Sequence, residues 1–410
     1  MSRTPRFERT LAEGRAPERT PRSSAAPTRR CRILYVAGEL HKGGYERQLY
    51  YLIRALDRER YTPAVAVWNY RATDLHVSLL EQLGVPIYSL GEARSRLGKL
   101  MALRRLVTQL TPEIIHSYNF YTNFAATWAA AGTNAITIGS VRNGFAWSKQ
   151  TSGPVAGRLS ARWPAHQIYN SFAAAEEVQG ARSYFVPKQT YVVTNGLDLA
   201  RFRQTDVPMR KPAEIVGVGY WLPAKRWDRL VRAAAALKER GFRFRIRMVG
   251  GGPLGTALQQ QISHAGVVDC VQLVTHTDDV PSLLAEAAFV VHTADNEGCP
   301  NAVMEAMACG RAVVATRAGD TPKLIDDGVT GFVVAADDET MLANRIAELI
   351  GQPEQCVRMG AAARRKAERD FSTDRLLCQT LQAYRAAGWH DPLGDSGLID
   401  HASTPASGAA

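Results

Sequence analysis

Short apolar runs alternate with longer amphipathic segments along most of this chain. The first run is RILYVA at 32–37, and the segment after it places Leu49, Leu52, Ile53 and Leu56 on one face of a helix. Such short runs predict strands, and the i, i+3, i+4 spacing predicts amphipathic helices. Because strands that alternate with helices form parallel sheets covered on both faces, the pattern predicts an α/β fold.

The alternation occurs in two series, which predicts two domains. In the first series, further strands are predicted at 63–68, 114–116, 135–141, 167–170 and 191–194. The pattern restarts with EIVGVG at 214–219 and continues to a helical segment that ends near residue 370. We expect two Rossmann-like domains that face each other, an N-terminal one at 31–205 and a C-terminal one at 206–371. Ligands of open α/β sheets bind at the carboxyl ends of the strands, so two facing sheets would form one deep cleft.

Both ends of the chain depart from this pattern. Ser372 can cap a last helix over 372–388, which we expect to cross back to the N-terminal domain. Residues 1–30 contain eight Arg against three Glu and have no apolar set to bury, so a disordered basic tail is expected. Residues 389–410 are rich in Gly, Ser, Ala and Asp, and a second disordered tail is expected there.

Composition argues against several classes of protein. No stretch approaches the ~20 apolar residues of a membrane-spanning helix, and the N-terminus has no signal-peptide core. We therefore expect a cytoplasmic location. The six cysteines lack C-x-x-C or metal-site spacing, so neither a metal site nor a disulfide framework is expected. The net charge of +11 is dispersed rather than gathered into a stripe with aromatic residues, which disfavours nucleic acid as a partner.

One basic segment leaves peripheral membrane contact open. In RSRLGKLMALRR at 94–105, apolar residues such as Leu97 and Met101 interleave with Arg and Lys. A helix that lies on a membrane surface has this pattern, and so does an ordinary surface helix.

The densest candidate chemistry lies at 297–310, in EGCPNAVMEAMACG. A strand-like FVVH precedes it, Pro300 suits the first turn of a helix, and Gly310 suits the position just past its end. Free N–H groups at a helix N-terminus favour anions, and carboxylates such as Glu297 and Glu305 can bind two vicinal sugar hydroxyls. The alternative is that Glu297 caps the helix and Glu305 is a surface residue.

The sequence EGCPNAVMEAMACGRAVVAT at 297–316 resembles the E-x7-E signature of the family-4 (group 1) retaining glycosyltransferases, which have the GT-B fold. The resemblance implies that Glu297 lies beside the donor sugar and that Glu305 holds the ribose of the nucleotide. Other segments match in order and spacing. They are the Gly-Gly-x-Glu loop at 43–46, the strand that ends in His116, and the phosphate-binding loop from Gly219 to Lys225.

This resemblance implies a set of site residues. The catalytic residues would be Glu297, His116 and Lys225, with His116 lining the cleft. The residues that bind the donor would be Gly43, Gly44, Lys225, Arg226, Gly298, Cys299, Pro300, Asn301, Ala302 and Glu305.

One position departs from the family pattern. The family usually has an Arg just after the glycine of the phosphate-binding loop, and this Arg and the Lys together neutralise the diphosphate leaving group. Tyr220 stands at that position here, while Lys225 is present. Arg226 adjoins Lys225 and could supply the second charge; otherwise, turnover or donor choice would differ from the family's.

A second glycine pattern must be weighed against this assignment. Gly250, Gly252 and Gly255 satisfy G-x-G-x-x-G between a predicted strand and helix, and Asp269 follows at a distance suited to a ribose. However, Asp269 precedes the next predicted strand instead of following it, and the family has a glycine turn of its own here. NAD(P) binding is therefore disfavoured.

The resemblance implies an enzyme that transfers a sugar from a nucleotide-diphosphate sugar to a saccharide or lipid-linked acceptor, with retention of configuration. It also implies a role in polysaccharide biosynthesis. No metal is expected, because Lys225 and the helix dipole stand in for it, and no cofactor is expected, because the nucleotide sugar is a co-substrate. Two alternatives stay open: a GT-B epimerase, and a nucleotide-sugar-binding relative with altered or lost activity.

Overall fold

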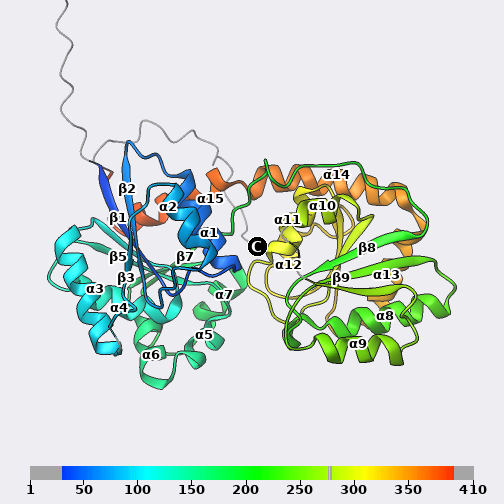
Figure 1. Cartoon of the computed structure of the whole chain (residues 1–410), viewed down its shortest axis with the longest axis horizontal. Helices are drawn as coiled ribbons and strands as arrows, with labels where there is room; N and C mark the ends of the chain where they lie inside the picture. Colours follow the sequence, from blue (N-terminus) through cyan, green and yellow to red (C-terminus); the bar gives the residue numbers. More distant parts are fainter. Residues whose placement is uncertain (1–29, 94, 276, 278, 392–410) are drawn as a thin grey trace, which may run out of the picture.

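Two α/β lobes stand side by side in the protein, each with its own parallel sheet (Figure 1). The computed structural model describes residues 30–391, apart from residues 94, 276 and 278. In the N-terminal lobe the seven strands are ordered β3-β2-β1-β4-β5-β6-β7, and in the C-terminal lobe the six strands are ordered β10-β9-β8-β11-β12-β13. The predicted α/β fold with two facing Rossmann-like domains is confirmed. The two predicted disordered tails fall almost entirely outside the described residues.

The N-terminal lobe contains these elements in chain order: β1 (Cys31–Ala37), α1 (Gly44–Ala55), β2 (Tyr61–Val67), α2 (Leu75–Gln82), β3 (Ile87–Ser89), α3 (Arg96–Leu110), β4 (Ile114–Ser117), η1 (Phe120–Thr122), α4 (Asn123–Ala130), β5 (Ile136–Val141), α5 (Phe145–Thr151), α6 (Pro154–Arg162), β6 (His166–Tyr169), α7 (Phe172–Gly180) and β7 (Gln189–Val192).

The C-terminal lobe and the last helices follow: β8 (Ala213–Val218), η2 (Pro223–Lys225), α8 (Trp227–Glu239), β9 (Phe244–Gly250), α9 (Gly255–His264), β10 (Val271–Thr275), α10 (Val280–Ala285), β11 (Phe289–His292), α11 (Asn301–Ala308), β12 (Ala312–Thr316), α12 (Thr321–Leu324), β13 (Gly331–Val334), α13 (Glu339–Gly351), α14 (Pro353–Asp370) and α15 (Thr373–Ala386).

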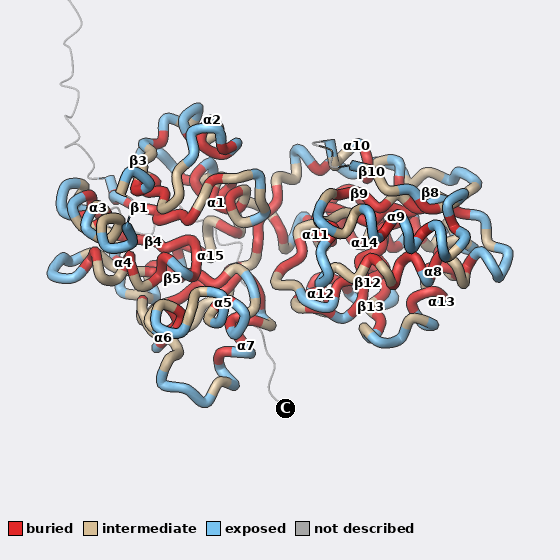
Figure 2. The backbone as a smooth tube through the Cα atoms, turned by 60° about the horizontal axis from the view of Figure 1, so that its bottom comes forward, coloured by how far each residue is buried: buried red, intermediate tan, exposed pale blue. Residues whose placement is uncertain are grey.

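The central strands are mostly apolar because helices cover both faces of each sheet. In β1, Ile33 and Tyr35 pack into one hydrophobic cluster, while Leu34 and Val36 pack into another on the opposite face. All four residues of β11 are buried. Figure 2 shows the same arrangement, with buried backbone along the strands and exposed backbone in the outer helices and loops.

The chain crosses back to its first lobe at the end, as predicted. Helix α14 packs against α11 in the C-terminal lobe, whereas α15 packs against α1. Leu376 and Tyr384 of α15 are buried in the core of the N-terminal lobe. The Ser372 hydroxyl caps α15 by accepting a hydrogen bond from the Arg375 N–H at 3.1 Å. The lobes also meet at α7, where the Asp320 carboxylate accepts from the N–H groups of Phe172 and Ala173.

Packing suggests a different domain boundary from the expected one. Leu197 and Phe202 lie in a hydrophobic cluster of the C-terminal lobe, although the sequence pattern placed them before the boundary at 205. We propose that the N-terminal domain ends near residue 195. Among the described helices, none is both long and apolar enough to cross a bilayer.

Candidate active site

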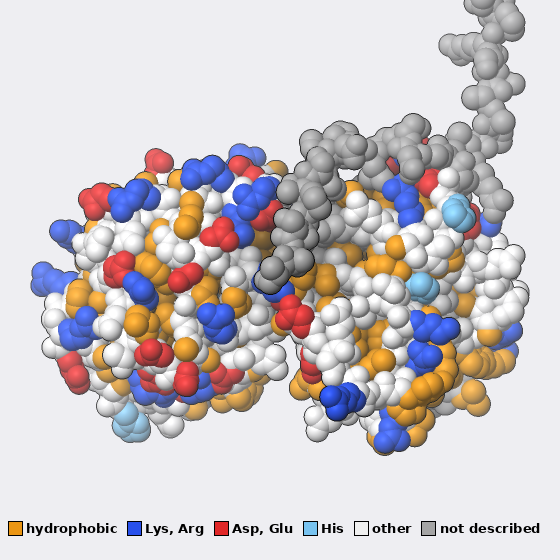
Figure 3. All heavy atoms as spheres, turned by 180° about the vertical axis from the view of Figure 1, so that it is seen from behind, with side chains coloured by type: hydrophobic (Ala, Val, Ile, Leu, Met, Phe, Trp, Pro, Cys, Tyr) orange, Lys and Arg blue, Asp and Glu red, His pale blue; other side chains and the backbone are white. Residues whose placement is uncertain are grey.

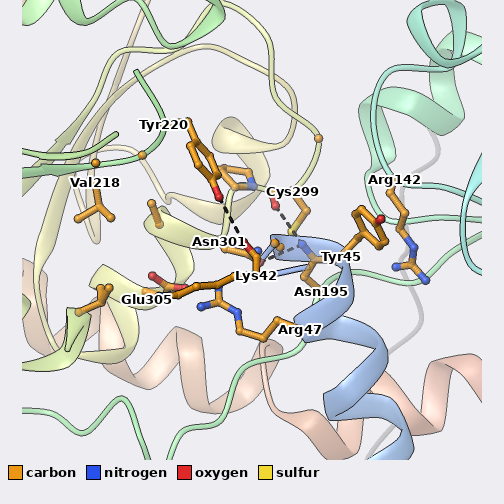
Figure 4. Close-up of a pocket in the computed structure, with 18 of the residues that line it drawn as sticks. Lys42, Tyr45, Arg47, Arg142, Asn195, Val218, Tyr220, Cys299, Asn301 and Glu305 are labelled. Carbon is orange, nitrogen blue, oxygen red and sulfur yellow. Dashed lines mark hydrogen bonds and ion pairs between the residues drawn. The ribbon is translucent and has the colours of Figure 1, made fainter. Parts of the chain in front are cut away.

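A cavity of about 790 Å³ lies between the two lobes. The N-terminal lobe contributes the loop before α1, the first turns of α1 and the residues after β5. The C-terminal lobe contributes the loops after β8 and β11 and the start of α11. The two sheets therefore face each other with the carboxyl ends of their strands, as expected for a shared ligand site. Figure 4 shows side chains from both lobes converging on this space.

Helix α11 starts at the cavity. Pro300 is its N-cap residue, and Pro300, Asn301 and Ala302 all line the cavity. Proline has no side-chain acceptor for the first N–H groups, and such groups at a helix N-terminus attract anions. Gly310 follows the helix with φ +74°, a backbone conformation that favours glycine. The predicted start and end of this helix are therefore confirmed.

Glu297 and Lys225 form a partly buried ion pair on one side of the cavity. The ring nitrogen Nε2 of His292 lies 3.0 Å from Glu297 Oε1. Burial alone would raise the pKa of Glu297, but the hydrogen bond from His292 and the charge of Lys225 outweigh it and lower this pKa to about 2. The Thr293 hydroxyl also donates to the Lys225 carbonyl at 2.9 Å. All four residues belong to the C-terminal lobe, so its fold alone sets the geometry of this pair.

A close backbone contact holds Glu297 in place. Gly319 has φ +51°, and a Cβ atom at this position would lie 2.2 Å from the Glu297 carbonyl oxygen. Only glycine fits here without displacing the loop that carries Glu297.

Glu305 pairs with Arg47, which comes from the other lobe. The Arg47 guanidinium donates through Nη2 to Glu305 Oε1, and both residues line the cavity. The Glu305 side chain is buried, with 5% of its surface exposed, so it is not the surface residue of the alternative interpretation. Figure 4 shows Arg47 reaching from α1 towards Glu305 on α11.

The glycine loop before α1 lies against the start of α11. Gly43 is the N-cap of α1, and a Cβ atom at Gly44 would lie 3.0 Å from Asn301 Nδ2. The Asn195 side chain donates to the Cys299 carbonyl at 3.1 Å and to Asn301 Oδ1 at 3.0 Å. The glycine loop thus lies against the Asn301 side chain at this edge of the cavity, where Gly43, Gly44, Gly298 and Cys299 are all part of its lining.

Two of the sequence-predicted residues do not reach the cavity. His116 is fully buried, and its ring nitrogens bond the Tyr384 hydroxyl at 2.7 Å and the Ser140 hydroxyl at 2.9 Å. Burial, with the charge of Arg142, lowers the pKa of His116 well below its ordinary value. His116 therefore joins β4, β5 and α15 in the core, and the expectation that it lines the cleft is wrong.

Arg226 is the second such residue. Its guanidinium bonds Asp228 and, at 2.8 Å, Asp295, and Arg226 is not among the described residues that line the cavity. It therefore does not supply the charge that Tyr220 lacks. The Tyr220 side chain lines the cavity, and its hydroxyl donates to the Lys42 carbonyl of the other lobe at 3.2 Å.

The second glycine pattern packs against protein. A Cβ atom at Gly252 would lie 2.8 Å from the Trp221 carbonyl oxygen, and one at Gly255 would lie 3.2 Å from the Trp221 ring. Asp269 lies before β10 and bonds Lys238 at 2.6 Å. The packing of Trp221 thus explains Gly252 and Gly255, whereas a Cβ atom at Gly250, which lines the cavity, would lie 2.0 Å from the Gly219 carbonyl oxygen. These contacts add no support to a dinucleotide site. Within the described ranges, no group of three or more His, Cys, Asp or Glu residues has the arrangement of a metal site.

Sequence reasoning missed Arg47 and His292. His292 ends a predicted strand, which is a position where cleft residues occur, so a signal was present. Arg47 follows the glycine loop directly, but no local pattern indicates that it reaches a residue 258 positions away.

Comparisons with known proteins match both lobes. Residues 42–201 match the model of a family described as Glycosyltransferase Family 4, and residues 213–352 match one described as Glycosyl transferases group 1. The D-inositol 3-phosphate glycosyltransferase of Saccharomonospora viridis is 33% identical over 220 residues, which cover 49% of this chain and 51% of that protein. The putative colanic acid biosynthesis glycosyltransferase WcaL of Escherichia coli is 31% identical over 48% of this chain and 52% of its own length. The chain thus spans about half the length of these curated relatives.

Solved structures extend the likeness over the whole fold. The Anabaena protein HepE in complex with UDP has a TM-score of 0.73 at 22% identity, covering 87% of this chain and all of that one. A sucrose-phosphate synthase from Thermosynechococcus elongatus has a TM-score of 0.70 at 18% identity, covering 87% of this chain and 99% of that one. At such identities the likeness concerns the fold.

Proposed function

The chain belongs to the group 1, family-4 glycosyltransferases with the GT-B fold, and from this premise we propose that it transfers a sugar from a nucleotide diphosphate to an acceptor hydroxyl. The observation that carries the proposal is the cavity itself. It brings together the two carboxylates of the E-x7-E pattern, Lys225 and the start of α11 from separate segments of the chain.

The proposed reaction retains the anomeric configuration. The bond between the anomeric carbon and the β-phosphate oxygen breaks, and the acceptor oxygen bonds that carbon from the same face. The acceptor's proton moves to the departing phosphate oxygen, so the products are the glycoside and the nucleoside diphosphate. In this scheme Glu305 holds the ribose, Glu297 faces the donor sugar, and Lys225 and the first N–H groups of α11 stabilise the developing charge of the diphosphate.

The names of relatives narrow the first donors to test. HepE has been solved with UDP-glucose, and a Mycolicibacterium smegmatis relative is described as a GDP-mannose-dependent mannosyltransferase. We therefore put UDP-glucose and GDP-mannose first, followed by ADP- and dTDP-sugars. A donor present well above its Kd should stabilise the protein by ~2–3 kcal/mol, which a thermal-shift panel detects. If no nucleotide sugar stabilises the protein, the proposal fails.

Product analysis separates the proposal from its alternatives. With the bound donor and a panel of saccharide and lipid-linked acceptors, we expect a glycoside whose anomeric configuration, read by NMR, matches that of the donor. An epimerase would instead change the donor when no acceptor is present. A binding relative would shift the melting temperature but release no nucleoside diphosphate.

A lipid-linked acceptor would place the enzyme at the cytoplasmic face of a membrane, and α3 is the surface that we propose for this contact. Leu97 is 66% exposed and Met101 42% exposed on this helix, which also carries Arg and Lys. Figure 3 shows hydrophobic and basic side chains side by side on one face of the N-terminal lobe, although it does not single out α3. The double variant Leu97→Ser/Met101→Ser should pellet less with vesicles of anionic phospholipid than wild type. Equal pelleting would contradict the contact.

A further inference from the structure

In the phosphate-binding loop of the C-terminal lobe, Lys225 is the cation that lines the cavity where the diphosphate of the proposed reaction would leave. Lys225 is already paired with Glu297, and Arg226 is held by Asp228 and Asp295. Tyr220 brings no charge. A diphosphate that departs in a partly enclosed cavity develops negative charge, and preorganised cations there strongly affect the rate. The other basic residues that line the cavity and could supply additional charge are Lys42, Arg47, Arg142 and Arg201.

Arg47 is the basic residue best placed to supply this charge. Figure 4 shows Arg47 next to Glu305 and Lys42 in the middle of the site, whereas Arg142 lies apart from them, near Tyr45. The Arg142 guanidinium lies over the Tyr118 ring at 4.0 Å from its centre, in the N-terminal lobe. Lys42 offers its carbonyl to the Tyr220 hydroxyl, which places the backbone of Lys42 beside the position that lacks the usual Arg.

The contacts of Arg47 leave part of its guanidinium unused. Nη2 bonds Glu305, but among the described residues none bonds the buried Nε atom. A guanidinium has five N–H donors in a planar fork, which suits bidentate binding of phosphate oxygens. The carboxylate that Arg47 contacts is that of Glu305, which binds the ribose in the proposed function.

These contacts imply that Arg47 and the ribose hydroxyls of a bound nucleotide compete for the Glu305 carboxylate. Ribose hydroxyls that donate to Glu305 would take over acceptor positions that now face Arg47. The diphosphate of the same nucleotide follows directly after the ribose, so a phosphate oxygen would be the nearest new partner for the guanidinium. Binding of the donor would thus replace the Glu305 carboxylate with a phosphate as the anion that Arg47 contacts.

We propose that Arg47 is the second cation for the leaving diphosphate, replacing the usual Arg that Tyr220 displaces, and that Glu305 holds it in position while no nucleotide is bound. This inference rests on the proposed function. Because Arg47 belongs to the N-terminal lobe and the donor is bound mainly by the C-terminal lobe, leaving-group stabilisation requires the lobes to be together. Departure of the diphosphate is then coupled to a closed cavity from which water is excluded.

The first experiment compares a nucleoside with its diphosphate by calorimetry. UDP and uridine, and GDP and guanosine, are titrated into wild type, Arg47→Ala and Arg54→Ala. We expect Arg47→Ala to bind the diphosphate at least tenfold more weakly, and to bind the nucleoside equally or more tightly because Glu305 is released. Arg54 is the matched control, since it lies on the same helix and also pairs with a carboxylate beyond the N-terminal sheet, that of Asp198 at 2.7 Å. Its removal should change neither affinity.

Opposite effects on the two ligands distinguish the inference from a structural role. If Arg47 only supports the fold, Arg47→Ala weakens nucleoside and diphosphate alike, and the inference is wrong. Arg47→Lys, which keeps the charge, provides a second test if the alanine variant folds poorly, and it should keep most of the diphosphate affinity. If wild type binds neither diphosphate, the proposed function fails; if it binds one that Arg47→Ala binds equally well, only the inference fails.

The second experiment moves the charge. The double variant Arg47→Ala/Tyr220→Arg should have a kcat at least tenfold higher than that of Arg47→Ala, because a guanidinium then enters the site from the C-terminal lobe. No recovery, together with unchanged diphosphate affinity in Arg47→Ala, would overturn the assignment.

Discussion

Two pairs of a cation and a carboxylate lie at the cavity, and they differ in how the fold holds them. Lys225 and Glu297 belong to one lobe, and His292 and the Gly319 contact fix Glu297 in the same lobe. Arg47 and Glu305 belong to different lobes, so their contact exists only where the lobes meet. The fold of one lobe preorganises the first pair, whereas the geometry of the second pair depends on how the two lobes are placed relative to each other. For the two carboxylates, this difference predicts that Glu297 acts mainly on the chemical step and Glu305 mainly on nucleotide binding.

The largest expected effect separates the two glutamates kinetically. Glu297→Gln should lower kcat by roughly 100- to 1000-fold, since it removes a charge beside the reacting sugar and leaves Lys225 without its partner. Glu305→Gln should mainly raise the donor KM, by roughly tenfold, because the ribose lies away from the bond that breaks. Initial rates at varied donor concentration measure both constants. A larger loss of kcat in Glu305→Gln than in Glu297→Gln would contradict the comparison.

The pH dependence of stability tests the preorganised pair without any substrate. The folded-state pKa of Glu297 is about 2, below the ordinary 4.5, so its ionised form stabilises the fold above pH 4.5 and this contribution is lost as the pH falls from 4.5 towards 2. At pH 3 the loss should be about 2 kcal/mol of unfolding free energy, at about 1.4 kcal/mol per pH unit. Urea unfolding of Glu297→Gln between pH 7 and pH 3 should lack this component.

A control for this measurement is Glu348→Gln on the surface of α13. Burial would raise the pKa of Glu348, but hydrogen bonds from Gln355 and Arg345 lower it. Because the Glu348 side chain is 26% exposed, compared with 11% for Glu297, its removal should change the pH dependence less. Equal changes in the two variants would show that Glu297 is not specially stabilised in the ionised form.

The contrast between the pairs also explains what the sequence could predict. Glu297 and Glu305 stand within nine residues, on a strand–loop–helix unit with its own capping signals, so local pattern and family resemblance located both. The pairing of Arg47 with Glu305 depends on how two independently folded sheets meet, which no local pattern encodes. His116 illustrates the same limit, because its local pattern led to a wrong prediction. Its place at a strand end suits a cleft residue, but α15 returns from the end of the chain and packs Tyr384 against it.

The sequence pattern also failed to predict four short helices and one short strand. α2, α5, α6 and α7 have seven to nine residues each, and β3 has three. Elements this short contain too few residues for a periodicity to stand out, and tertiary packing decides their conformation. All five lie in the N-terminal lobe, where the acceptor is expected to bind.

A smaller effect is expected from the glycine that packs against Glu297. Gly319→Ala places a Cβ atom against the Glu297 carbonyl and imposes φ +51° on an alanine, so it should cost about 1–3 kcal/mol of stability and also lower kcat. The matched control is Gly328→Ala, where φ is +75° and no heavy atom lies within 4 Å of the added Cβ. This variant should lose about 1 kcal/mol, the conformational part alone, and keep its kcat. Chemical denaturation and steady-state rates measure both; equal losses of kcat would show that the contact does not position Glu297.

The smallest effect is expected at Tyr220, the residue whose hydroxyl bonds the opposite lobe. Tyr220→Phe removes its hydrogen bond to the Lys42 carbonyl, but the side chain is 53% exposed and water can replace the lost partner. An exposed hydrogen bond contributes at most about 1 kcal/mol, so the donor KM should rise by less than about fivefold and kcat should hardly change. Tyr184→Phe, on an exposed tyrosine outside the cavity lining, should leave both constants unchanged. A large loss of kcat in Tyr220→Phe would mean that this hydroxyl acts on the leaving group itself, and the interlobe contact of Arg47 would then not be the main substitute for the absent arginine.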